Sequence, residues 1–254
     1  MDAGDDGQWA MLLAGRQPAG ALGALFGPVL ALPAAPDGCL VIGRLAQTLD
    51  GRIATQGGIS QWIGGAADLR HTHRLRALCH AVVVGAATVA ADDPLLTTRL
   101  VPGAHPVRVV IDTEARLPAA AQVFHGGPAT LWVVAADKAG AQRHGEAETL
   151  PLPRGGDGRL DLAALLGALA ARGLRKIFVE GGGVTVSRFL MAGLLDRLHV
   201  TVAPLILGSG RPAFSLPEAG CIADGLRFSW TVHDIAPDVL FDIALHRARP
   251  PLCP

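Results

Sequence analysis

The segment from Ile177 to Gly183 combines an acidic side chain with three consecutive glycines. Ile177-Phe178-Val179 predicts a buried strand that ends at Glu180, and Gly181-Gly182-Gly183 then leads into a helix predicted over 184–191. Glycines allow a phosphate to approach the backbone, and a helix N-terminus offers unpaired N–H groups and the positive end of its dipole. Ligands of open α/β sheets bind at the carboxyl ends of the strands, where Glu180 lies. The pattern indicates a dinucleotide pyrophosphate site, with a tight turn that binds nothing as the alternative.

A second segment with side chains suited to ligand binding is the loop that contains Ser60 and Trp62. Both residues follow the glycine pair Gly57-Gly58, ahead of a predicted helix. The hydroxyl of Ser60 is suited to a polar group of a substrate or cofactor, and the indole of Trp62 is suited to cover a planar ring. An isolated tryptophan is more often part of the core, so by itself this segment favours packing over binding.

Two arginines are candidates for binding an anion. Arg76 lies near the end of a helix predicted over 66–78, and Arg99 follows an acidic pair, Asp92-Asp93, and a proline. A guanidinium holds phosphate through two parallel hydrogen bonds, so both side chains suit a phosphorylated ligand. A single arginine is more often a solvated surface residue, and the hypothesis requires both to enter one cleft.

Other apparent motifs give no support to competing functions. Gly208-Ser209-Gly210-Arg211-Pro212-Ala213 fits a dinucleotide fingerprint formally, but Pro212 and the lack of a following βαβ unit with an acidic residue mark a chance match. His71 and His73 are two residues apart, so they diverge on a helix and predict exposed polarity rather than a metal site. Neither a G-x-S-x-G elbow nor a P-loop lysine occurs, so serine hydrolase and P-loop functions lack support.

Short β-branched runs alternate with helical patterns along most of the chain. This alternation predicts βαβ units, and therefore an α/β fold with a mainly parallel sheet flanked by helices. The predicted strands cover residues 40–42, 81–85, 107–112, 130–135, 176–180 and 199–207, and the predicted helices cover 66–78, 87–91, 160–171 and 184–191. Two further runs, 226–234 and 238–246, predict a C-terminal antiparallel hairpin.

The composition indicates a sizeable apolar core and no surface for polyanions. Half of the 254 residues are apolar and 17% are charged, which suits one large α/β domain or two small ones. Basic and acidic residues both number 22, so the net charge is zero, and neither nucleic acid nor a membrane surface is predicted as a partner. The four cysteines form no C-x-x-C pair, which is typical of reduced thiols in a cytosolic protein.

The first 38 residues differ in character from the rest. We expect an N-terminal extension or arm over 1–38 and a single domain over 39–254. The acidic start, from Met1 to Asp6, argues against a secretory signal. Glycines and prolines interrupt the apolar stretch 19–35, whereas a membrane helix needs about 20 apolar residues without a break. This stretch predicts a packed, irregular extension.

Taken in order, several segments resemble the riboflavin-biosynthesis pyrimidine reductases. The matching segments are 48–54, 60–63, 75–77, 84–99, 106–112, 179–183 and 203–208, so the resemblance runs from about Leu40 to the C-terminus. It implies a dihydrofolate-reductase-like fold, usually dimeric, and NADPH-dependent reduction of 5-amino-6-(5-phosphoribosylamino)uracil to its ribitylamino form. The hydride would go to the sugar carbon that bears the amine; the resemblance names no proton donor.

The resemblance also implies which residues face each ligand. On the cofactor side it places Ala46, Trp62, Thr88, Asp92, Thr113, Gly182, Gly183 and Ser187. On the substrate side it places Ser60, Arg76, Leu96, Arg99 and Glu180, with the two arginines on the phosphate and Glu180 on the pyrimidine or the sugar hydroxyls. Arg116 is a candidate for the 2′-phosphate of the cofactor, and no metal ligand is expected.

Departures from the family pattern leave two other functions open. Many bacterial relatives carry a zinc deaminase with H-x-E and P-C-x-x-C motifs, which residues 1–38 lack, so deamination is not predicted here. Thr48-Leu49-Asp50-Gly51-Arg52 also stands where Ser-Leu-Asp-Gly-Lys is frequent. The alternatives are an NADPH-dependent reductase of another imine or pterin-like substrate, and a non-catalytic dinucleotide-binding protein. We expect a cytoplasmic homodimer, in which the arm covers the cleft, exchanges between subunits or extends the dimer.

Overall fold

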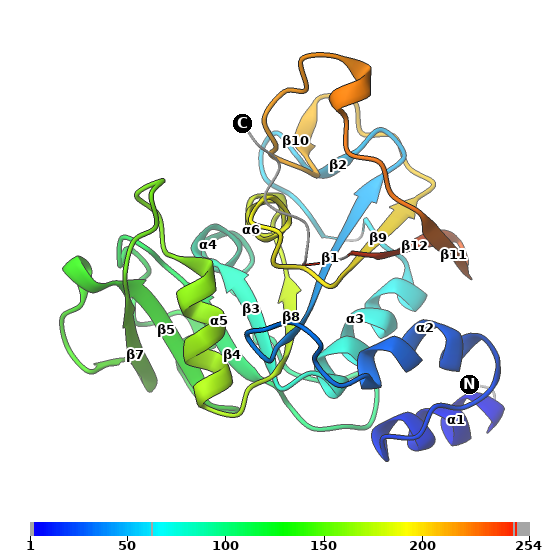
Figure 1. Ribbon diagram of the computed structural model, residues 1–254, viewed down its shortest axis with the longest axis horizontal. Coiled ribbons are helices and arrows are strands. Elements are labelled where there is room, and N and C mark those ends of the chain that lie inside the picture. The colour runs from blue at the N-terminus through cyan, green and yellow to red at the C-terminus, as the bar shows by residue number, and fades with distance from the viewer. Residues whose placement is uncertain (1–2, 62, 246, 248–254) are drawn as a thin grey trace.

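A ten-stranded sheet lies between two layers of helices in the computed structural model, which describes residues 3–61, 63–245 and 247 (Figure 1). The strands are β1 (Leu40–Thr48), β2 (Arg52–Thr55), β3 (Ala81–Gly85), β4 (Val107–Ile111), β5 (Thr130–Ala135), β6 (Arg143–His144), β7 (Ala147–Leu152), β8 (Lys176–Glu180), β9 (Arg197–Ala203), β10 (Gly210–Pro212), β11 (Trp230–Ile235) and β12 (Asp238–Ala244). The helices are α1 (Ala3–Leu13), α2 (Gly20–Leu30), α3 (Ala66–Leu78), α4 (Ala86–Asp92), α5 (Leu162–Ala171) and α6 (Gly183–Met191), with short 3-10 turns at Gln122–Phe124, Ala136–Lys138 and Ile222–Asp224.

The strand order is β11-β12-β9-β1-β8-β3-β4-β5-β7-β6. The strands from β9 to β7 pair in parallel, whereas β12, β11 and β6 are antiparallel to their neighbours. The predicted mainly parallel sheet and C-terminal hairpin are therefore confirmed. The hairpin strands are shorter than predicted, since residues 226–229 are not in a strand; His246 lies outside the described residues.

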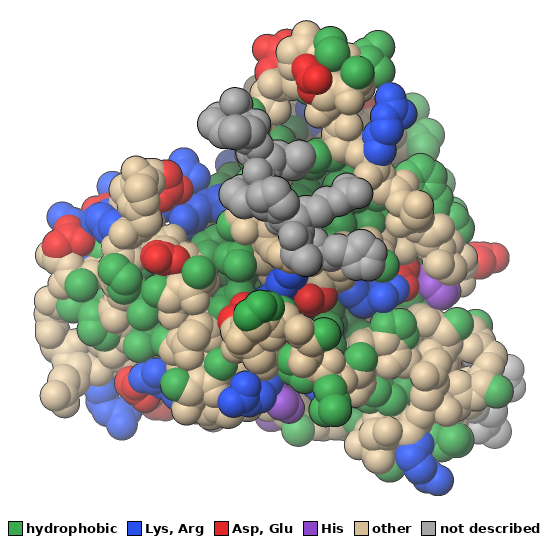
Figure 2. All heavy atoms as spheres, in the orientation of Figure 1, with side chains coloured by type: hydrophobic (Ala, Val, Ile, Leu, Met, Phe, Trp, Pro, Cys, Tyr) green, Lys and Arg blue, Asp and Glu red, His purple; other side chains and the backbone are tan. Residues whose placement is uncertain are grey.

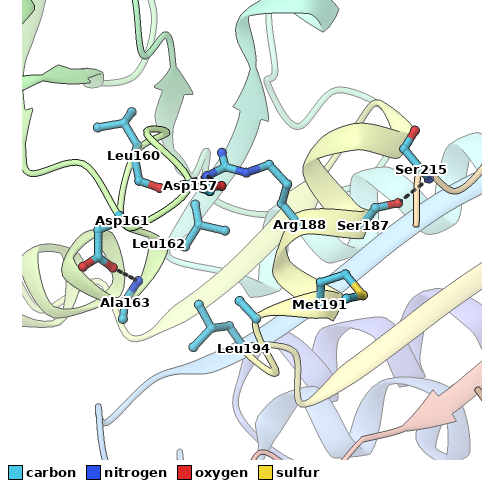
Figure 3. A pocket seen from close by; sticks show the side chains of 12 residues that line it. Asp157, Leu160, Asp161, Leu162, Ala163, Ser187, Arg188, Met191, Leu194 and Ser215 are labelled. Carbon is cyan, nitrogen blue, oxygen red and sulfur yellow. Dashed lines mark hydrogen bonds and ion pairs between the residues drawn. The ribbon is translucent and has the colours of Figure 1, made fainter. Parts of the chain in front are cut away.

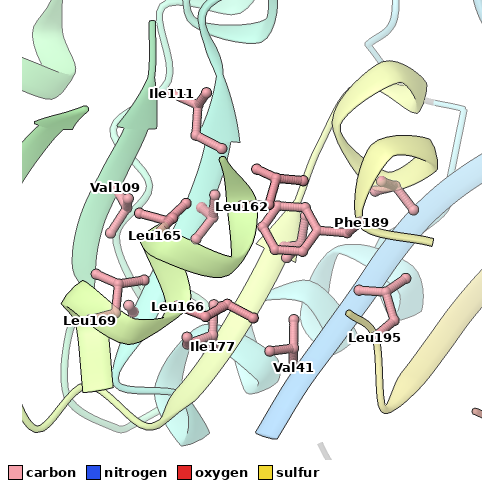
Figure 4. Close-up of a cluster of buried hydrophobic side chains, with 14 of the residues drawn as sticks. Val41, Val109, Ile111, Leu162, Leu165, Leu166, Leu169, Ile177, Phe189 and Leu195 are labelled. Carbon is pink, nitrogen blue, oxygen red and sulfur yellow. The ribbon is translucent and has the colours of Figure 1, made fainter. Parts of the chain in front are cut away.

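The central strands are apolar without interruption because both faces of the sheet are buried. In β4, Val109 and Ile111 pack into the cluster beneath α5 and α6, and Val110 packs into the opposite cluster. Figure 4 shows the first cluster, where Leu165 of α5 and Phe189 of α6 lie against the sheet. Runs buried on both faces are typical of parallel sheets, which is why the sequence located these strands well.

The N-terminal extension is helical, so the prediction of an irregular segment was wrong. Glycines and Pro28 disfavour a helix over 20–30, but burial of an apolar stripe outweighs that propensity. Phe26 and Val29 of α2 and Trp9 of α1 are buried in one cluster with Leu75 of α3. Of the helices that the structure describes, none combines the length and apolar character needed to cross a membrane.

The turn after β1 and the turn after β9 rise beyond the carboxyl edge of the large sheet (Figure 1). There β2 and β10 form a separate two-stranded antiparallel sheet. Gly210–Pro212 is therefore a strand, and the apparent fingerprint at 208–213 does not lead into a helix, as the sequence indicated. On the face that Figure 2 shows, acidic and basic side chains are interspersed, in keeping with the zero net charge.

Candidate active site

Glu180 and Arg76 form a bidentate, largely buried ion pair at the carboxyl end of β8. Arg76 reaches across from the last turn of α3, with Nε 2.8 Å from Oε2 and Nη2 2.5 Å from Oε1 of Glu180. Its Nη1 donates to the carbonyl of Thr97 at 2.9 Å. Burial raises the pKa of Glu180, but the charge and hydrogen bonds of Arg76 outweigh it and hold the pKa below its usual range. Glu180 is thus an anion with acceptor capacity left for a ligand.

The two arginines predicted to act together meet at Thr97. Arg76 donates to its carbonyl, and Nη1 of Arg99 donates to its hydroxyl at 3.0 Å. They differ in exposure, because the side chain of Arg76 is 8% exposed whereas Arg99 is at the surface. Every guanidinium nitrogen of Arg76 already has a protein acceptor. Arg99 is therefore the cation of the two that is accessible to a dissolved anion.

The prediction that His71 and His73 are exposed was wrong. Both are buried, because the sheet covers one side of α3 and the N-terminal helices cover the other. As their spacing implied, the two side chains diverge: His71 Nε2 lies 3.1 Å from His199 Nδ1, and His73 Nδ1 accepts from the backbone N–H of Arg99 at 2.8 Å. Burial, followed by the charges of Arg76 and Arg99, lowers the pKa of His73 to about 4. His73 is thus a neutral acceptor at pH 7.

A row of polar side chains crosses the sheet from the ion pair, and sequence analysis missed it. The row consists of Glu180, Arg44, His199 and Asp242, which are register partners on β8, β1, β9 and β12. Arg44 also pairs with the buried Asp68 of α3. The available signal was a polar residue at alternate positions of otherwise apolar strands. Across residues 3–61, 63–245 and 247, no group of three or more His, Cys, Asp or Glu side chains is arranged to hold a metal ion.

Asp242 anchors the far end of this row. Its oxygens receive Nε and Nη2 of Arg197 at 3.1 and 2.5 Å, and its Oδ1 lies 3.2 Å from Nε2 of His199. Burial raises the pKa of Asp242, but the interactions with His199 and Arg197 lower it more, to about 2. The carboxylate is therefore charged throughout the physiological pH range.

The N-terminus of α6 fits an anionic group of a dinucleotide. Gly182 is the N-cap residue and supplies no side-chain cap, so the first turn is open on the side of the exposed Val184. The N–H of Gly182 donates to the hydroxyl of Thr88 at 3.2 Å, which unites two predicted cofactor residues. Gly183 has a different reason to be glycine: a Cβ there would lie 2.1 Å from the carbonyl oxygen of Ala213.

One substrate candidate and one cofactor candidate are joined next to α4. The hydroxyl of Ser60 donates to Oδ1 of Asp92 at 3.1 Å. Asp92 is exposed and Ser60 is half-buried, so the pair is accessible to a ligand. Trp62, which follows closely in the chain, lies outside the described residues.

Three other predicted residues lie at or near the carboxyl edge of the sheet. Thr113 and the exposed Arg116 follow the end of β4, and the carbonyl of Thr113 accepts a backbone hydrogen bond from β5. Ala46 lies two residues beyond Arg44 on β1, hence on the same face of the sheet.

Leu96 and Ser187 stand apart from these contacts. Leu96 is 1% exposed and has a φ of +55°, so its side chain belongs to the core and only its backbone is available at the loop. Ser187 is also buried, and its hydroxyl accepts from the N–H of Ser215 at 2.8 Å. It lines a pocket of about 380 Å³ between α5 and α6, together with Arg188 and Asp157 (Figure 3).

The segment Thr48 to Arg52, part of the family resemblance, ties two turns together. Asp50 accepts from the hydroxyl of Thr48 at 2.5 Å and from the N–H groups of Leu207 and Gly208 at 3.2 and 2.7 Å. Nε of Arg52 donates to the carbonyl of Gly208 at 3.0 Å. These polar side chains hold the β1–β2 turn against the segment that leads to β10.

Comparison with known proteins places this geometry in a family. The model of the RibD C-terminal domain matches residues 40–224. The 2,5-diamino-6-ribosylamino-4(3H)-pyrimidinone 5′-phosphate reductase of Methanothermobacter thermautotrophicus is 40% identical over 194 residues, which cover 74% of this chain and 88% of that protein. The riboflavin biosynthesis protein RibD of Escherichia coli is 34% identical over 211 residues, which cover 77% of this chain and 57% of that protein.

Among solved structures, RibD of Acinetobacter baumannii superimposes with a TM-score of 0.74 at 27% identity, over 89% of this chain and 63% of that one. This chain thus spans most of the archaeal reductase and somewhat under two thirds of the two RibD proteins. The matched region contains β1 to β10 and every candidate ligand-binding residue, but not α1, α2 or Asp242 of β12. The chain belongs to the RibD C-terminal domain family of riboflavin-biosynthesis reductases.

Proposed function

We propose that this chain is an NADPH-dependent reductase of riboflavin biosynthesis that acts in the cytoplasm on a phosphorylated ribosylaminopyrimidine. The observation that carries the proposal is the segment from Glu180 to Gly183. In it a half-buried carboxylate, held ionised by Arg76, lies three residues before Gly183, the first residue of α6, whose N-terminus has no side-chain cap. A hydrogen-bond acceptor for a substrate and an anion site for a cofactor therefore lie within four residues of one another.

The cofactor side of the proposed site follows the carboxyl edge of the sheet. The α6 N-terminus at Gly182 and Gly183 and the hydroxyl of Thr88 would hold the phosphates. The remaining assignments on this side are Ala46, Trp62, Asp92, Thr113 and Ser187. The nicotinamide, when bound, supplies the hydride, and the protein contributes binding, orientation and electrostatics.

On the substrate side of the proposed site, two cations and one carboxylate have separate roles. Glu180 accepts hydrogen bonds from N–H or O–H groups of the substrate, and the exposed Arg99 binds its phosphate. Arg76 is 8% exposed and directs three of its five N–H groups to Glu180 and Thr97, so we assign it to keep Glu180 ionised and to hold the loop at Thr97. Ser60 and the backbone of Leu96 complete this side.

The test is an assay of NADPH oxidation, which is monitored as the loss of NADPH absorbance in the near ultraviolet. Two substrates should be compared: 5-amino-6-(5-phosphoribosylamino)uracil and the 2,5-diamino-pyrimidinone phosphate that names the archaeal relative. They differ in carrying an oxygen or an amino group at one ring carbon. We expect turnover of at least one, and faster turnover with NADPH than with NADH. NADPH binding without turnover of either would favour another imine or pterin-like substrate, or a non-catalytic role.

We also propose that the protein forms a homodimer through β11. This strand ends the sheet order, and its Trp230 and Val232 are 57% and 53% exposed. Next to it lies an apolar groove of about 960 Å³, lined in part by Phe228 and Phe241. An exposed apolar edge pairs readily with another chain, and twofold symmetry lets β11 pair with its own copy.

Sedimentation velocity tests the dimer. A charge at the edge should disfavour pairing, so Val232→Lys should shift the protein towards monomer. Leu32→Lys, at a position that is 88% exposed in the N-terminal extension, should leave the dimer intact. A wild-type monomer at all accessible concentrations would contradict the proposal.

A further inference from the structure

The N-terminal helices lie outside the region that matches the family, yet α1 touches the loop that carries Arg99. The family match begins at residue 40, whereas α1 ends at Leu13 and α2 at Leu30. Both helices lie beside α3 (Figure 1). We call residues 97–103, which run from Thr97 to Gly103 ahead of β4, the substrate loop. What α1 does to this loop is therefore a property of this chain and not of the matched domain.

A buried tryptophan of α1 makes a hydrogen bond to the substrate loop. Nε1 of Trp9 donates to the carbonyl of Pro102 at 2.9 Å, and Trp9 is 3% exposed. Leu13, one turn later on α1, lies against Gly103, where an added Cβ would be 3.4 Å from its Cδ2. The same Cβ would be 2.6 Å from Cβ of Ala77 on α3. The end of the loop is thus enclosed between α1 and α3.

The other end of the substrate loop is attached to α3. His73 accepts from the N–H groups of Arg99 and Leu100 at 2.8 and 3.4 Å, and Arg76 donates to the carbonyl of Thr97 at 2.9 Å. These bonds set the course of the backbone on either side of the Arg99 side chain. The loop is therefore attached to α3 near Arg99 and to α1 near Pro102, and Thr98 is also hydrogen-bonded to Ala104 and His105.

Arg74 fixes α1 onto the same helix that holds the loop. Its Nη2 donates to Asp5 at 2.5 Å, and its guanidinium carbon lies 5.4 Å from the ring centre of Trp9 and 5.9 Å from that of Phe26. Cation–π contacts of this kind orient the aromatic ring as well as stabilise it. Along α3, Arg74 thus faces the N-terminal helices, while His73 and Arg76 face the substrate loop and the ion pair.

We propose that α1 is a positioning element of the active site: through the Trp9–Pro102 hydrogen bond it holds the substrate loop so that Arg99 meets the phosphate of the substrate. The role of the loop rests on the proposed function, whereas the attachment of α1 to it does not. Trp9 is a positioning residue in this scheme, because it acts through the loop and touches no reacting group.

The experiment compares the full-length wild type with Trp9→Phe, which keeps an aromatic ring and removes the N–H donor. Hydrogen–deuterium exchange of the peptide that spans 97–103 is measured first, without any ligand. Loss of one hydrogen bond should speed local exchange by about threefold to tenfold. With the phosphorylated substrate, KM should rise by a similar factor of about threefold to tenfold, while kcat stays within about twofold. With the dephosphorylated substrate, KM should not change.

Asp6→Ala is the matched control. It changes an exposed side chain of α1 and leaves both the Arg74–Asp5 ion pair and the Trp9–Pro102 bond in place. Exchange in the loop and KM should both stay at the wild-type values. Unchanged exchange in Trp9→Phe would overturn the inference, as would equal changes in KM for the two substrates, since a general loss of structure does not distinguish them. If the wild type turned over neither pyrimidine, the proposed function would fail, and the exchange rates alone would decide whether α1 positions the loop.

Discussion

Replacing Glu180 with glutamine should show how strongly the ion pair with Arg76 stabilises the site. The substitution preserves shape but removes the charge that two guanidinium nitrogens contact at 2.8 and 2.5 Å. Glutamine can still accept one of these bonds, and its amide nitrogen then faces a cation. A charge-assisted hydrogen bond contributes roughly 1.5–3 kcal/mol, and breaking a fully buried pair costs about 3–5 kcal/mol.

The expected loss is smaller than the fully buried limit. The side chain of Glu180 is 17% exposed, so water compensates part of the lost charge, whereas that of Arg76 is 8% exposed. We therefore expect Glu180→Gln to lower the free energy of unfolding by about 2–3 kcal/mol. Urea unfolding at neutral pH measures this, provided that the transition is two-state.

A double-mutant cycle with Arg76→Met isolates the pair from other effects of each substitution. The coupling should be about 2 kcal/mol at neutral pH. Because the pKa of Glu180 lies below its usual range, this contribution is present above the ordinary carboxyl pKa and is lost as the pH falls through the lowered value. The deficit of Glu180→Gln should therefore shrink in acid. A coupling below about 0.5 kcal/mol at neutral pH would refute the reasoning.

Two other perturbations separate packing from charge. Gly183→Ala should destabilise the fold by more than about 1 kcal/mol, because the new Cβ would lie 2.1 Å from the carbonyl oxygen of Ala213. Gly167→Ala should instead raise the melting temperature, because Gly167 lies in the middle of α5 and a Cβ there would have nothing within 4 Å. For Asp242, with a pKa of about 2 in the folded protein, about 2 kcal/mol of stability should be lost as the pH falls from about 4 to 2, as denaturation midpoints can show. Asp242→Asn should abolish this part of the acid sensitivity, and parallel profiles for the two proteins would contradict the assignment.

Local patterns determined the central elements of this protein. The runs 81–85, 130–135 and 176–180 are strands with the predicted bounds, because the buried interior of a strand covered on both faces is apolar without alternation. The helix 66–78 was also predicted with its observed bounds. Glycines after Glu180 marked the turn from β8 into α6, since few other residues permit that approach of the backbone.

Tertiary structure alone decided the chemistry around these elements. Arg76 and Glu180 are 104 positions apart, and nothing local indicates that the arginine pairs with this carboxylate. The prediction that the histidines of α3 are exposed assumes that one face of this helix is in contact with solvent, whereas α1 and α2 cover that face. The prediction of an irregular segment over α2, which rested on helix propensity, was wrong for the same reason. Burial is set by which distant segments meet, and this depends on the packing of the whole chain, not on the neighbours of a residue in sequence.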